Sequence, residues 1–405
     1  MLGSIADGRT DISGFLAGED CLATLSAMSA MGIEIDRPSE TDLVIHGAGL
    51  RGLGKPDAAL DLGNSGTAMR LMVGLLAGQQ FSSTLTGDES LTSRPMQRVI
   101  SPLDRMGARI DSHDGRPPLA IQGHSSLRAI HYELPVASAQ VKSAILFAGL
   151  YANGTTTVVE PAVTRDHTER MLQSMGVAVT VSGKSISLQS GRALVACQVA
   201  VPGDLSSAAF VILAALISEK ADVLIENVGV NPTRTGVIDI LQSMGADITL
   251  ENPHLLGQEP VADIRVRASK LHGGPVDPGL VSLAIDEFPV LFVAAAAAHG
   301  KTTFSGIGEL RVKESDRIAA MAAGLRELGI EVEESRNGAI VQGGSFAGGV
   351  VESCGDHRIA MSFAVAATIA NDVVTVQDVA AVDTSFPGFC NRLTSIGADI
   401  RSGQD

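Results

Sequence analysis

The chain has 405 residues, of which 45% are hydrophobic and 19% charged, and its formal net charge is −15. Its length favours two or three domains, and its acidity argues against non-specific binding to nucleic acids or anionic membranes. The longest apolar run, 288–298, contains Pro289 and is shorter than the roughly 20 residues needed to span a bilayer. The four cysteines form no CxxC pair and no secretory signal opens the chain. We therefore expect a cytoplasmic protein with reduced thiols, Cys354 being buried, and with no membrane or nucleic-acid partner.

One pattern recurs along the chain: an apolar helix end, a glycine and a short strand, as in 103–110 and 241–248. Glycine suits the left-handed residue that ends a helix, and the alternation after it predicts a strand. The recurring glycines are 68 to 84 residues apart, by subtraction of their positions, which predicts one supersecondary unit used six times. The six units divide as three plus three, with a boundary near 201–204. The glycines are Gly32, Gly107, Gly176, Gly245, Gly329 and Gly397.

Further strands are expected where β-branched residues lie between turn residues, and second helices where long apolar runs occur. The expected strands are 43–46, 81–86, 155–160, 222–226, 263–267 and 373–376. The expected helices are 65–77, 139–150, 205–217, 287–298 and 357–369. Several of these helices are apolar on all sides, so we expect them to be buried.

One glycine motif is not expected to bind a dinucleotide. Residues 47–52 match GxGxxG after a strand, but such a site needs a helix to begin there, and Gly54 and Pro56 follow instead. The sequence contains no GxxxxGK[ST] phosphate loop, and its nine histidines show no HxxxH spacing. We therefore expect neither a cofactor nor a metal.

Helix starts are the stronger candidates for a binding site. At 62–70 we expect Asn64 to cap a helix whose first turn holds Gly66 and Thr67, leaving backbone N–H groups open to an anion. At 136–142 we expect Ser138 to be the cap, with Gln140 and Lys142 as donors. Taken by itself, each start is more often explained by plain capping. The cations near these starts suggest a substrate with phosphate or carboxylate groups; they are Arg70, Arg94, Lys142, Arg165, Lys313, Arg317 and Arg358.

The segment 309–317 carries the densest charge and leads into a helix with apolar residues at 318, 321, 325 and 328. Extending that helix backwards places Glu314 in its apolar stripe and Arg317 beside it. Charges there are paired or line a site, although a charged first turn in water remains an alternative. Asp286 and Glu287, at another helix start, could share acid and base roles with Glu314, or could simply interact with the helix dipole.

Taken in chain order, these motifs resemble the 5-enolpyruvylshikimate-3-phosphate synthase family, second sequence class, over nearly the whole chain. They are LGNSGTAMR (62–70), SRPM (93–96), ASAQVKS (137–143), TRDHTE (164–169), GDLSSAA (203–209), NPTRTG (231–236), IDEFP (285–289), ELRVKESDR (309–317) and DHRIAM (356–361). The resemblance implies an α/β, two-domain inside-out barrel of βαβαββ repeats, with domains 1–201 and 202–405 closing on the substrates.

The resemblance also implies an activity: the enolpyruvyl group of phosphoenolpyruvate passes to the 5-hydroxyl of shikimate 3-phosphate through a tetrahedral intermediate. It implies a glyphosate-binding monomer of the chorismate pathway that needs no cofactor or metal. The implied acid–base residues are Asp286, Glu314 and Lys313. The implied substrate-binding residues are Asn64, Gly66, Thr67, Arg94, Ser138, Ala139, Gln140, Arg165, Arg317 and Arg358.

The sequence departs from the family at its start. The family opens with Pro-Gly-Asp-Lys-Ser-x-x-His-Arg, whereas Met1–Gly8 matches the sequence just after that segment. Thr384 also replaces a lysine found in many relatives. An impaired, shikimate-3-phosphate-binding protein is therefore an alternative to an active synthase. A UDP-sugar enolpyruvyl transferase is a weaker alternative, because the motifs at 137–140 and 164–167 are of the shikimate type.

Overall fold

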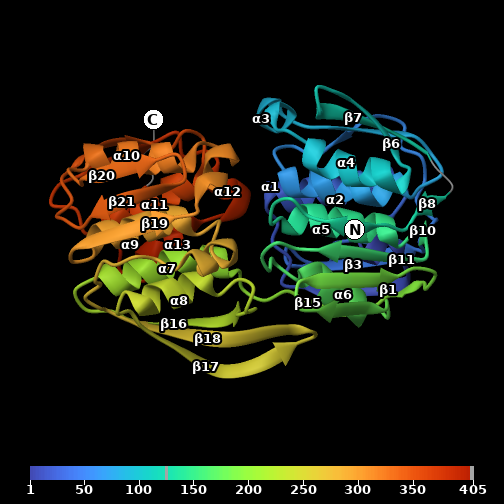
Figure 1. Cartoon of the computed structure of the whole chain (residues 1–405). Helices are drawn as coiled ribbons and strands as arrows, with labels where there is room; N and C mark the ends of the chain where they lie inside the picture. The colour runs from blue at the N-terminus through green and yellow to red at the C-terminus, as the bar shows by residue number, and fades with distance from the viewer. Residues whose placement is uncertain (124–125, 402–405) are drawn as a thin grey trace. The chain divides into compact units, whose positions relative to one another are not determined.

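The structure is a computed structural model that describes residues 1–123 and 126–401 (Figure 1). Contacts divide the chain into two compact units. The first comprises Met1–Val201 together with Leu256–Glu259, and the second comprises Pro202–Leu255 and Pro260–Asp405. Each unit has its own hydrophobic core, so each is described by itself below.

The first unit combines helices with several small mixed sheets. Its helical segments are η1 (Gly3–Ile5), α1 (Glu19–Ala30), α2 (Gly66–Ala77), α3 (Glu89–Ser93), α4 (Gln97–Met106), α5 (Ala139–Gly149) and α6 (His167–Ser174). Its strands are β1 (Ala6–Ser13), β2 (Glu34–Asp36), β3 (Asp42–Ala48), β4 (Leu60–Asp61), β5 (Ser83–Thr86), β6 (Arg109–His113), β7 (Arg116–Gln122), β8 (Leu127–Arg128), β9 (His131–Glu133), β10 (Ala152–Asn153), β11 (Thr155–Val159), β12 (Val179–Ser182), β13 (Ser185–Gln189), β14 (Leu194–Val195) and β15 (Gln198–Ala200).

Helices α2 and α5 form the centre of this unit and lie side by side in Figure 1. Their approach depends on small residues, because a Cβ added at Gly74 would overlap the backbone of Ala144. Nearly every residue of α5 after its first turn is buried. The sheets cover these helices; β1, for example, pairs antiparallel with β3 from Asp7↔Ala48 to Ser13↔Asp42 and parallel with β15. Close packing of α2 and α5 brings their N-terminal ends together.

The second unit follows the same plan. Its helical segments are α7 (Leu205–Ile217), α8 (Gly236–Ser243), η2 (Pro278–Leu283), α9 (Phe288–Ala297), η3 (Gly308–Val312), α10 (Arg317–Glu327), α11 (His357–Ala367), α12 (Val382–Ser385) and α13 (Phe389–Ser395). Its strands are β16 (Asp222–Gly229), β17 (Asp247–Leu256), β18 (Glu259–Arg267), β19 (Lys301–Ser305), β20 (Val332–Ser335), β21 (Gly338–Gln342), β22 (Gly349–Glu352) and β23 (Val374–Gln377).

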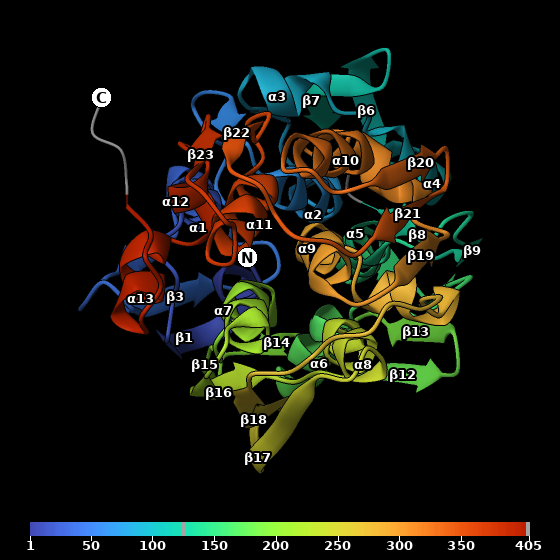
Figure 2. The same ribbon diagram turned by 90° about the vertical axis from the view of Figure 1, so that its left-hand side faces the viewer.

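Figure 2 looks along the helices of the second unit and shows α7, α9, α10 and α11 inside, with the sheets outside. The sheets are β16–β18–β17, β19–β21–β20 and β22–β23. Burial explains the arrangement: residues 288–296 of α9 are all buried, as expected for a helix that is apolar on every side. The predicted all-apolar helices are therefore confirmed here as internal elements.

The helix end and the glycine of the predicted pattern are confirmed at all six positions, and the strand that should follow is present after five of them; after Gly397, residues 398–400 form no strand. Each repeated glycine follows a helix and has a positive φ, between 82° at Gly329 and 103° at Gly397. This backbone conformation is strained for residues with a Cβ, which explains why the pattern places glycine there. The predicted strands and second helices are also present, with ends shifted by a few residues at most. One prediction is wrong: Cys354 is exposed and occupies a turn at φ 55°.

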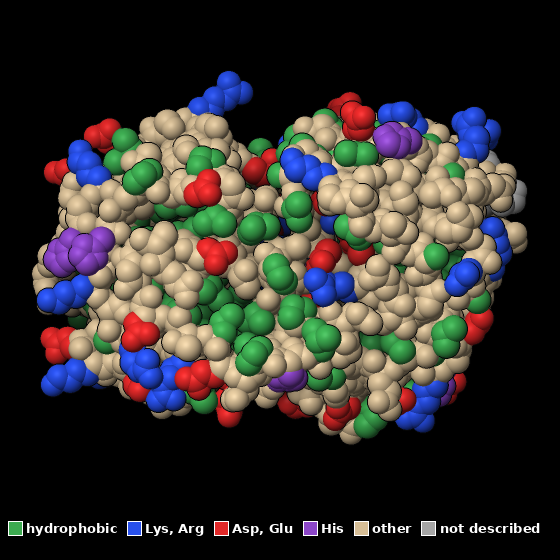
Figure 3. Space-filling model, turned by 60° about the horizontal axis from the view of Figure 1, so that its bottom comes forward, with side chains coloured by type: hydrophobic (Ala, Val, Ile, Leu, Met, Phe, Trp, Pro, Cys, Tyr) green, Lys and Arg blue, Asp and Glu red, His purple; other side chains and the backbone are tan. Residues whose placement is uncertain are grey.

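Within the described ranges 1–123 and 126–401, no helix has both the length and the apolar character required to cross a bilayer. On the face drawn in Figure 3, acidic and basic side chains are interspersed. No helix begins at the GxGxxG motif 47–52, as predicted. Strand β3 ends at Ala48, and the next helix begins only at Gly66.

Candidate functional site

The N-terminus of α2 carries the first group of predicted residues. Ser65 caps this helix, its Oγ accepting from the backbone N–H of Ala68 at 3.3 Å, so the prediction that Asn64 is the cap is wrong. Asn64 instead joins two loops: its Nδ2 donates to Asp88 at 2.7 Å, and its Oδ1 accepts from Arg94 at 2.5 Å. The Asn64 side chain thereby orients the guanidinium group of Arg94.

A polar network joins the starts of α2 and α5. Arg70 Nη1 donates to the Gly66 carbonyl at 3.1 Å and to Gln140 Oε1 at 2.8 Å, and Gln140 Nε2 donates to Thr67 Oγ1 at 2.7 Å. A Cβ at Gly66 would lie 2.9 Å from Arg70 Nη1 and 3.1 Å from Arg94 Nη1. Gly66 therefore allows two guanidinium groups to approach a helix N-terminus, an arrangement that suits an anion.

The start of α5 agrees with its prediction except at Lys142. Ser138 is the cap, its Oγ accepting from Val141 N at 3.3 Å, and Ala139 is the first helical residue. Ser138, Ala139 and Gln140 therefore lie at one helix end, close to Thr67 through Gln140. Arg165 lies outside this helix, half-buried in the turn that precedes α6.

Lys142 does not point to solvent as a free donor, so that prediction is wrong. Its side chain is 1% exposed, and Nζ lies 2.7 Å from Glu169 Oε1 and 3.2 Å from Glu160 Oε1. Burial raises the pKa of the Glu169 carboxyl, and the neighbouring Lys142 ammonium opposes this shift. The spacing of Lys142 on α5 explains the difference, because it places this side chain on the inner face of the helix.

In the second unit, α10 begins later than the sequence predicted, so the helix does not extend back to Glu314. Asp316 is its cap, accepting from Ala319 N at 3.1 Å, and Arg317 is its first residue. Glu314 therefore lies in the preceding turn rather than in the apolar stripe, which corrects the prediction. The stripe itself is confirmed, since Ile318, Met321, Leu325 and Leu328 are all fully buried.

Arg317 is paired rather than exposed in a first turn. Its side chain is 1% exposed; Nε donates to Asp356 Oδ2 at 2.8 Å, and Nη2 donates to Glu314 at 2.7 Å. Burial by itself raises the pKa of Asp356, but the Arg317 guanidinium outweighs that effect and holds this pKa below its ordinary value. The pairing decides against the alternative of a solvated charged turn.

Asp286 is the acceptor around which the remaining predicted cations gather. Lys313 Nζ lies 3.1 Å from Asp286 Oδ1, and Arg317 Nη1 lies 3.5 Å from the same oxygen. Arg358 Nη1 donates to the Asp286 backbone carbonyl at 3.0 Å. The structure thus brings Asp286, Lys313, Arg317 and Arg358 together, with Glu314 attached through Arg317.

Sequence reasoning missed a second network behind Asp286. Glu287 is 2% exposed and accepts from Ser206 Oγ, and its Oε1 lies 3.6 Å from Arg234 and 3.9 Å from Arg358. Arg234 also pairs with Asp204 at 3.2 Å. Glu287 is therefore buried among structural partners, unlike its neighbour Asp286. The motifs at 203–209 and 231–236 were the available signal for this network.

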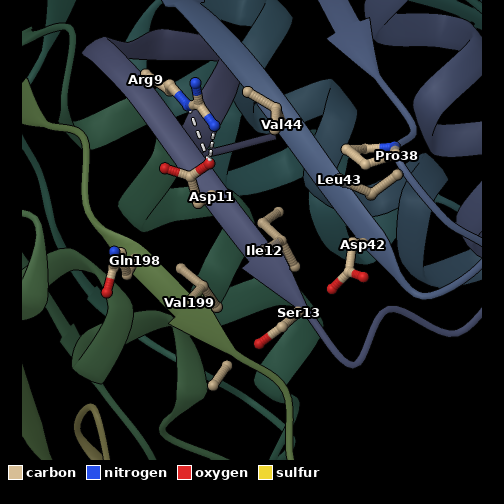
Figure 4. Close-up of a pocket in the computed structure, with 11 residues that line it drawn as sticks. Arg9, Asp11, Ile12, Ser13, Pro38, Asp42, Leu43, Val44, Gln198 and Val199 are labelled. Carbon is tan, nitrogen blue, oxygen red and sulfur yellow. Dashed lines mark hydrogen bonds and ion pairs between the residues drawn. The ribbon is translucent and has the colours of Figure 1, made fainter.

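Two further features lie apart from these residues in the first unit. A hollow of about 430 Å³ lies on strands β1, β3 and β15, where Figure 4 shows the Arg9–Asp11 ion pair beside Gln198 and Val199. None of the predicted site residues lines it. On the neighbouring strand β2 the side chains of Glu34 and Asp36 come near His46, with potential ligand atoms within 4.8 Å of one another.

A two-unit α/β fold with buried arginine–carboxylate clusters at helix starts agrees with the resemblance seen in the sequence. The chain belongs to the EPSP synthase (3-phosphoshikimate 1-carboxyvinyltransferase) family, whose model matches residues 1–393. The chain is 57% identical over 401 residues to the 3-phosphoshikimate 1-carboxyvinyltransferase of Methylococcus capsulatus, an alignment covering 99% of this chain and 92% of that protein. It is 54% identical over 408 residues to the 3-phosphoshikimate 1-carboxyvinyltransferase of Hydrogenovibrio crunogenus, an alignment covering 99% of this chain and 92% of that protein.

Solved structures confirm the fold class. The structure of EPSP synthase from Acinetobacter baumannii at 2.37 Å matches with a TM-score of 0.90 and 50% identity, covering 100% of this chain and 93% of that one. A second structure of EPSP synthase from the same organism matches with a TM-score of 0.89 and 49% sequence identity, again covering 100% of this chain and 93% of that one.

Proposed function

We propose that this chain is a 3-phosphoshikimate 1-carboxyvinyltransferase, which transfers the enolpyruvyl group of phosphoenolpyruvate to the 5-hydroxyl of shikimate 3-phosphate and releases phosphate. The observation that carries the proposal is the 57% identity over nearly the full chain to a relative of that name. The clusters around Asp286 and Gly66 support it, because each offers cations and helix N-terminal groups to anionic ligands.

On this proposal, the second unit holds phosphoenolpyruvate and moves protons. Lys313, Arg317 and Arg358 offer positive charge to its phosphate and carboxylate. Asp286 accepts the proton of the attacking 5-hydroxyl, and Glu314 delivers a proton to C3 of phosphoenolpyruvate. The paired state seen here, with Lys313 3.1 Å from Asp286, keeps these side chains oriented before the substrate arrives.

The first unit holds shikimate 3-phosphate. Ser138, Ala139 and Gln140 present the N-terminal end of α5 to the phosphate group of this substrate, and Arg165 adds a guanidinium group. We assign Asn64, Gly66 and Thr67 at the start of α2, together with the guanidinium of Arg94, to the binding of phosphoenolpyruvate. No cofactor enters this scheme.

The reaction balances as an addition followed by an elimination. The 5-oxygen bonds to C2 of phosphoenolpyruvate while C3 takes up a proton, which gives a tetrahedral intermediate. Loss of a proton from C3 and departure of phosphate from C2 then restore the double bond. Stabilising the charge that develops in the transition state is the main contribution that fixed cations can make.

Phosphate release is the direct test. The 405-residue chain, and the same chain preceded by the family's Pro-Gly-Asp-Lys-Ser-x-x-His-Arg segment, would be mixed with both substrates. Release that requires both substrates supports the proposal. Calorimetric binding of shikimate 3-phosphate without turnover in either form would favour the impaired binding protein instead. An assay in which a UDP-sugar competes with shikimate 3-phosphate as the acceptor tests the remaining alternative, a UDP-sugar enolpyruvyl transferase. We also propose a cytoplasmic monomer, which sedimentation and cell fractionation can test.

A further inference from the structure

We infer that Lys142 is a positioning residue that sets the place of Arg165 relative to the start of α5. The inference rests on the proposed function, because Arg165, Ser138 and Gln140 are proposed there to hold shikimate 3-phosphate. Lys142 itself is 1% exposed and so touches no ligand. It acts through the turn that carries Arg165.

The turn is attached to α5 on the N-terminal side of Arg165. Lys142 Nζ lies 3.5 Å from the carbonyl oxygen of Thr164, the residue directly before Arg165. The same ammonium lies 3.2 Å from Glu160, whose carboxylate also accepts from Thr164 Oγ1. Thr164 is consequently held through its backbone and its side chain, and both are buried.

The turn is attached again on the other side of Arg165. Lys142 Nζ lies 2.7 Å from Glu169 on α6, and the next residue of α5, Ser143, shares a 2.7 Å hydrogen bond between its Oγ and Thr168 Oγ1. Two consecutive residues of α5 thus hold both flanks of the three-residue interval 165–167, which contains Arg165. This double attachment leaves the turn little freedom to move relative to α5.

Placement of the charge strengthens the inference. Lys142 lies one helical turn after Ser138, so the anion-facing end of α5 and the buried ammonium belong to the same rigid segment. A buried ammonium between two carboxylates is expensive to maintain, and an apolar side chain would pack there as well. A role in positioning Arg165 explains the ion cluster better than a gain in stability does, because the three partners of Lys142 all flank Arg165.

Lys142→Met tests this inference in the complete chain. We expect KM for shikimate 3-phosphate to rise about tenfold, with KM for phosphoenolpyruvate within about twofold of wild type. A merely structural lysine would lower thermal stability without that split. Ser143→Ala is a second, milder variant of the same attachment and should shift the same KM in the same direction. Arg265→Gln, which removes an exposed ion pair with Asp222, is the matched control.

A double-mutant cycle separates positioning from general damage. In an Arg165→Ala background, Lys142→Met should raise KM for shikimate 3-phosphate no further, because the residue that it positions is gone. Additive effects would overturn the inference, and so would an unchanged KM in both Lys142→Met and Ser143→Ala. If Lys142→Met does not fold, the cycle is run with Ser143→Ala. Absence of turnover in wild type contradicts the proposed function instead.

Discussion

Lys313 Nζ lies 3.1 Å from Asp286 Oδ1, and this carboxylate also faces Arg317 at 3.5 Å. A carboxylate held between two cations can accept a proton from a hydroxyl group only if substrate groups displace or share those cations. Shikimate 3-phosphate and phosphoenolpyruvate bring a hydroxyl group and compensating anions, so the pairing is the resting state of the proposed acid–base centre.

Asp286→Asn should keep the fold and lower kcat by about 100- to 10,000-fold, the usual contribution of a positioned general base. The amide retains the shape of the side chain and cannot accept the proton. Steady-state kinetics measure the effect. Asp247→Asn is the control, because Asp247 is an exposed carboxylate that also pairs with an arginine. A kcat within a few-fold of wild type would remove Asp286 from its proposed role.

Gly66→Ala should raise KM for phosphoenolpyruvate and weaken inhibition by glyphosate. The added Cβ would lie 2.9 Å from Arg70 and 3.1 Å from Arg94, so both guanidinium groups must shift. Inhibition curves at fixed shikimate 3-phosphate measure the change. Gly274→Ala is the matched control, since a Cβ there meets nothing within 4 Å. Equal inhibition of Gly66→Ala and wild type would contradict the crowding argument.

Asp356→Ala should lower the free energy of unfolding by about 3–5 kcal/mol, because it leaves the buried Arg317 without its most buried partner. Urea unfolding at pH 7 measures the loss. The double variant Arg317→Met/Asp356→Leu should lose less stability than Asp356→Ala, since it removes both fully buried charges of the pair together. A larger loss in the double variant would show that packing, and not charge pairing, dominates at this site.

The same pair predicts how stability depends on pH. Arg317 holds the pKa of Asp356 below the ordinary value of 3.8 despite burial, so the unfolded chain binds more protons than the folded one in that range. The stabilisation is therefore complete above about pH 4 and is lost as pH falls through the lowered pKa. Urea midpoints of wild type and Asp356→Asn should converge as the solution is acidified. If the urea midpoints of the two proteins instead changed in parallel with pH, the result would contradict the lowered pKa of Asp356.

His357 should remain neutral at physiological pH. Burial, reinforced by Arg358, lowers the pKa of its imidazole to about 4 from 6.5. As the pH falls, the unfolded chain protonates this ring near pH 6.5, whereas the folded chain does so only near pH 4. The neutral ring therefore contributes stability above pH 6.5, and this stability is lost as the pH falls toward 4. An NMR titration of the ring protons measures the pKa directly. A midpoint near 6.5 would show that the ring is more accessible than the structure indicates.

The sequence predicted what depends on local patterns. Gly32 and its five equivalents were recognisable because helices commonly end in a left-handed residue, a conformation that glycine adopts without strain. Helix α7 was predicted to its exact ends, since Asp204 is a good cap and the run after it is apolar. These features depend on neighbours along the chain, which a single sequence displays.

The errors arose where partners lie far along the chain. Asn64 is a plausible cap, but it is occupied by Asp88 and Arg94, which leaves the cap to Ser65. Lys142 resembled an anion donor until Glu160 and Glu169 were seen beside it. The error at Glu314 is local instead, because Asp316, two residues later, caps the helix and so leaves Glu314 outside it. For Asn64 and Lys142, spacing alone did not contain the tertiary partners that decide the outcome.

The central claim is a reaction between two substrates, and one measurement tests it most directly. Phosphorus NMR of the protein with shikimate 3-phosphate and phosphoenolpyruvate should show inorganic phosphate and the enolpyruvyl ether of shikimate 3-phosphate growing in equal amounts. Neither should appear when one substrate is omitted, and both should form at least about 100-fold more slowly when Asp286→Asn replaces the wild type. Phosphate release without shikimate 3-phosphate, or no product from wild type, would contradict the account.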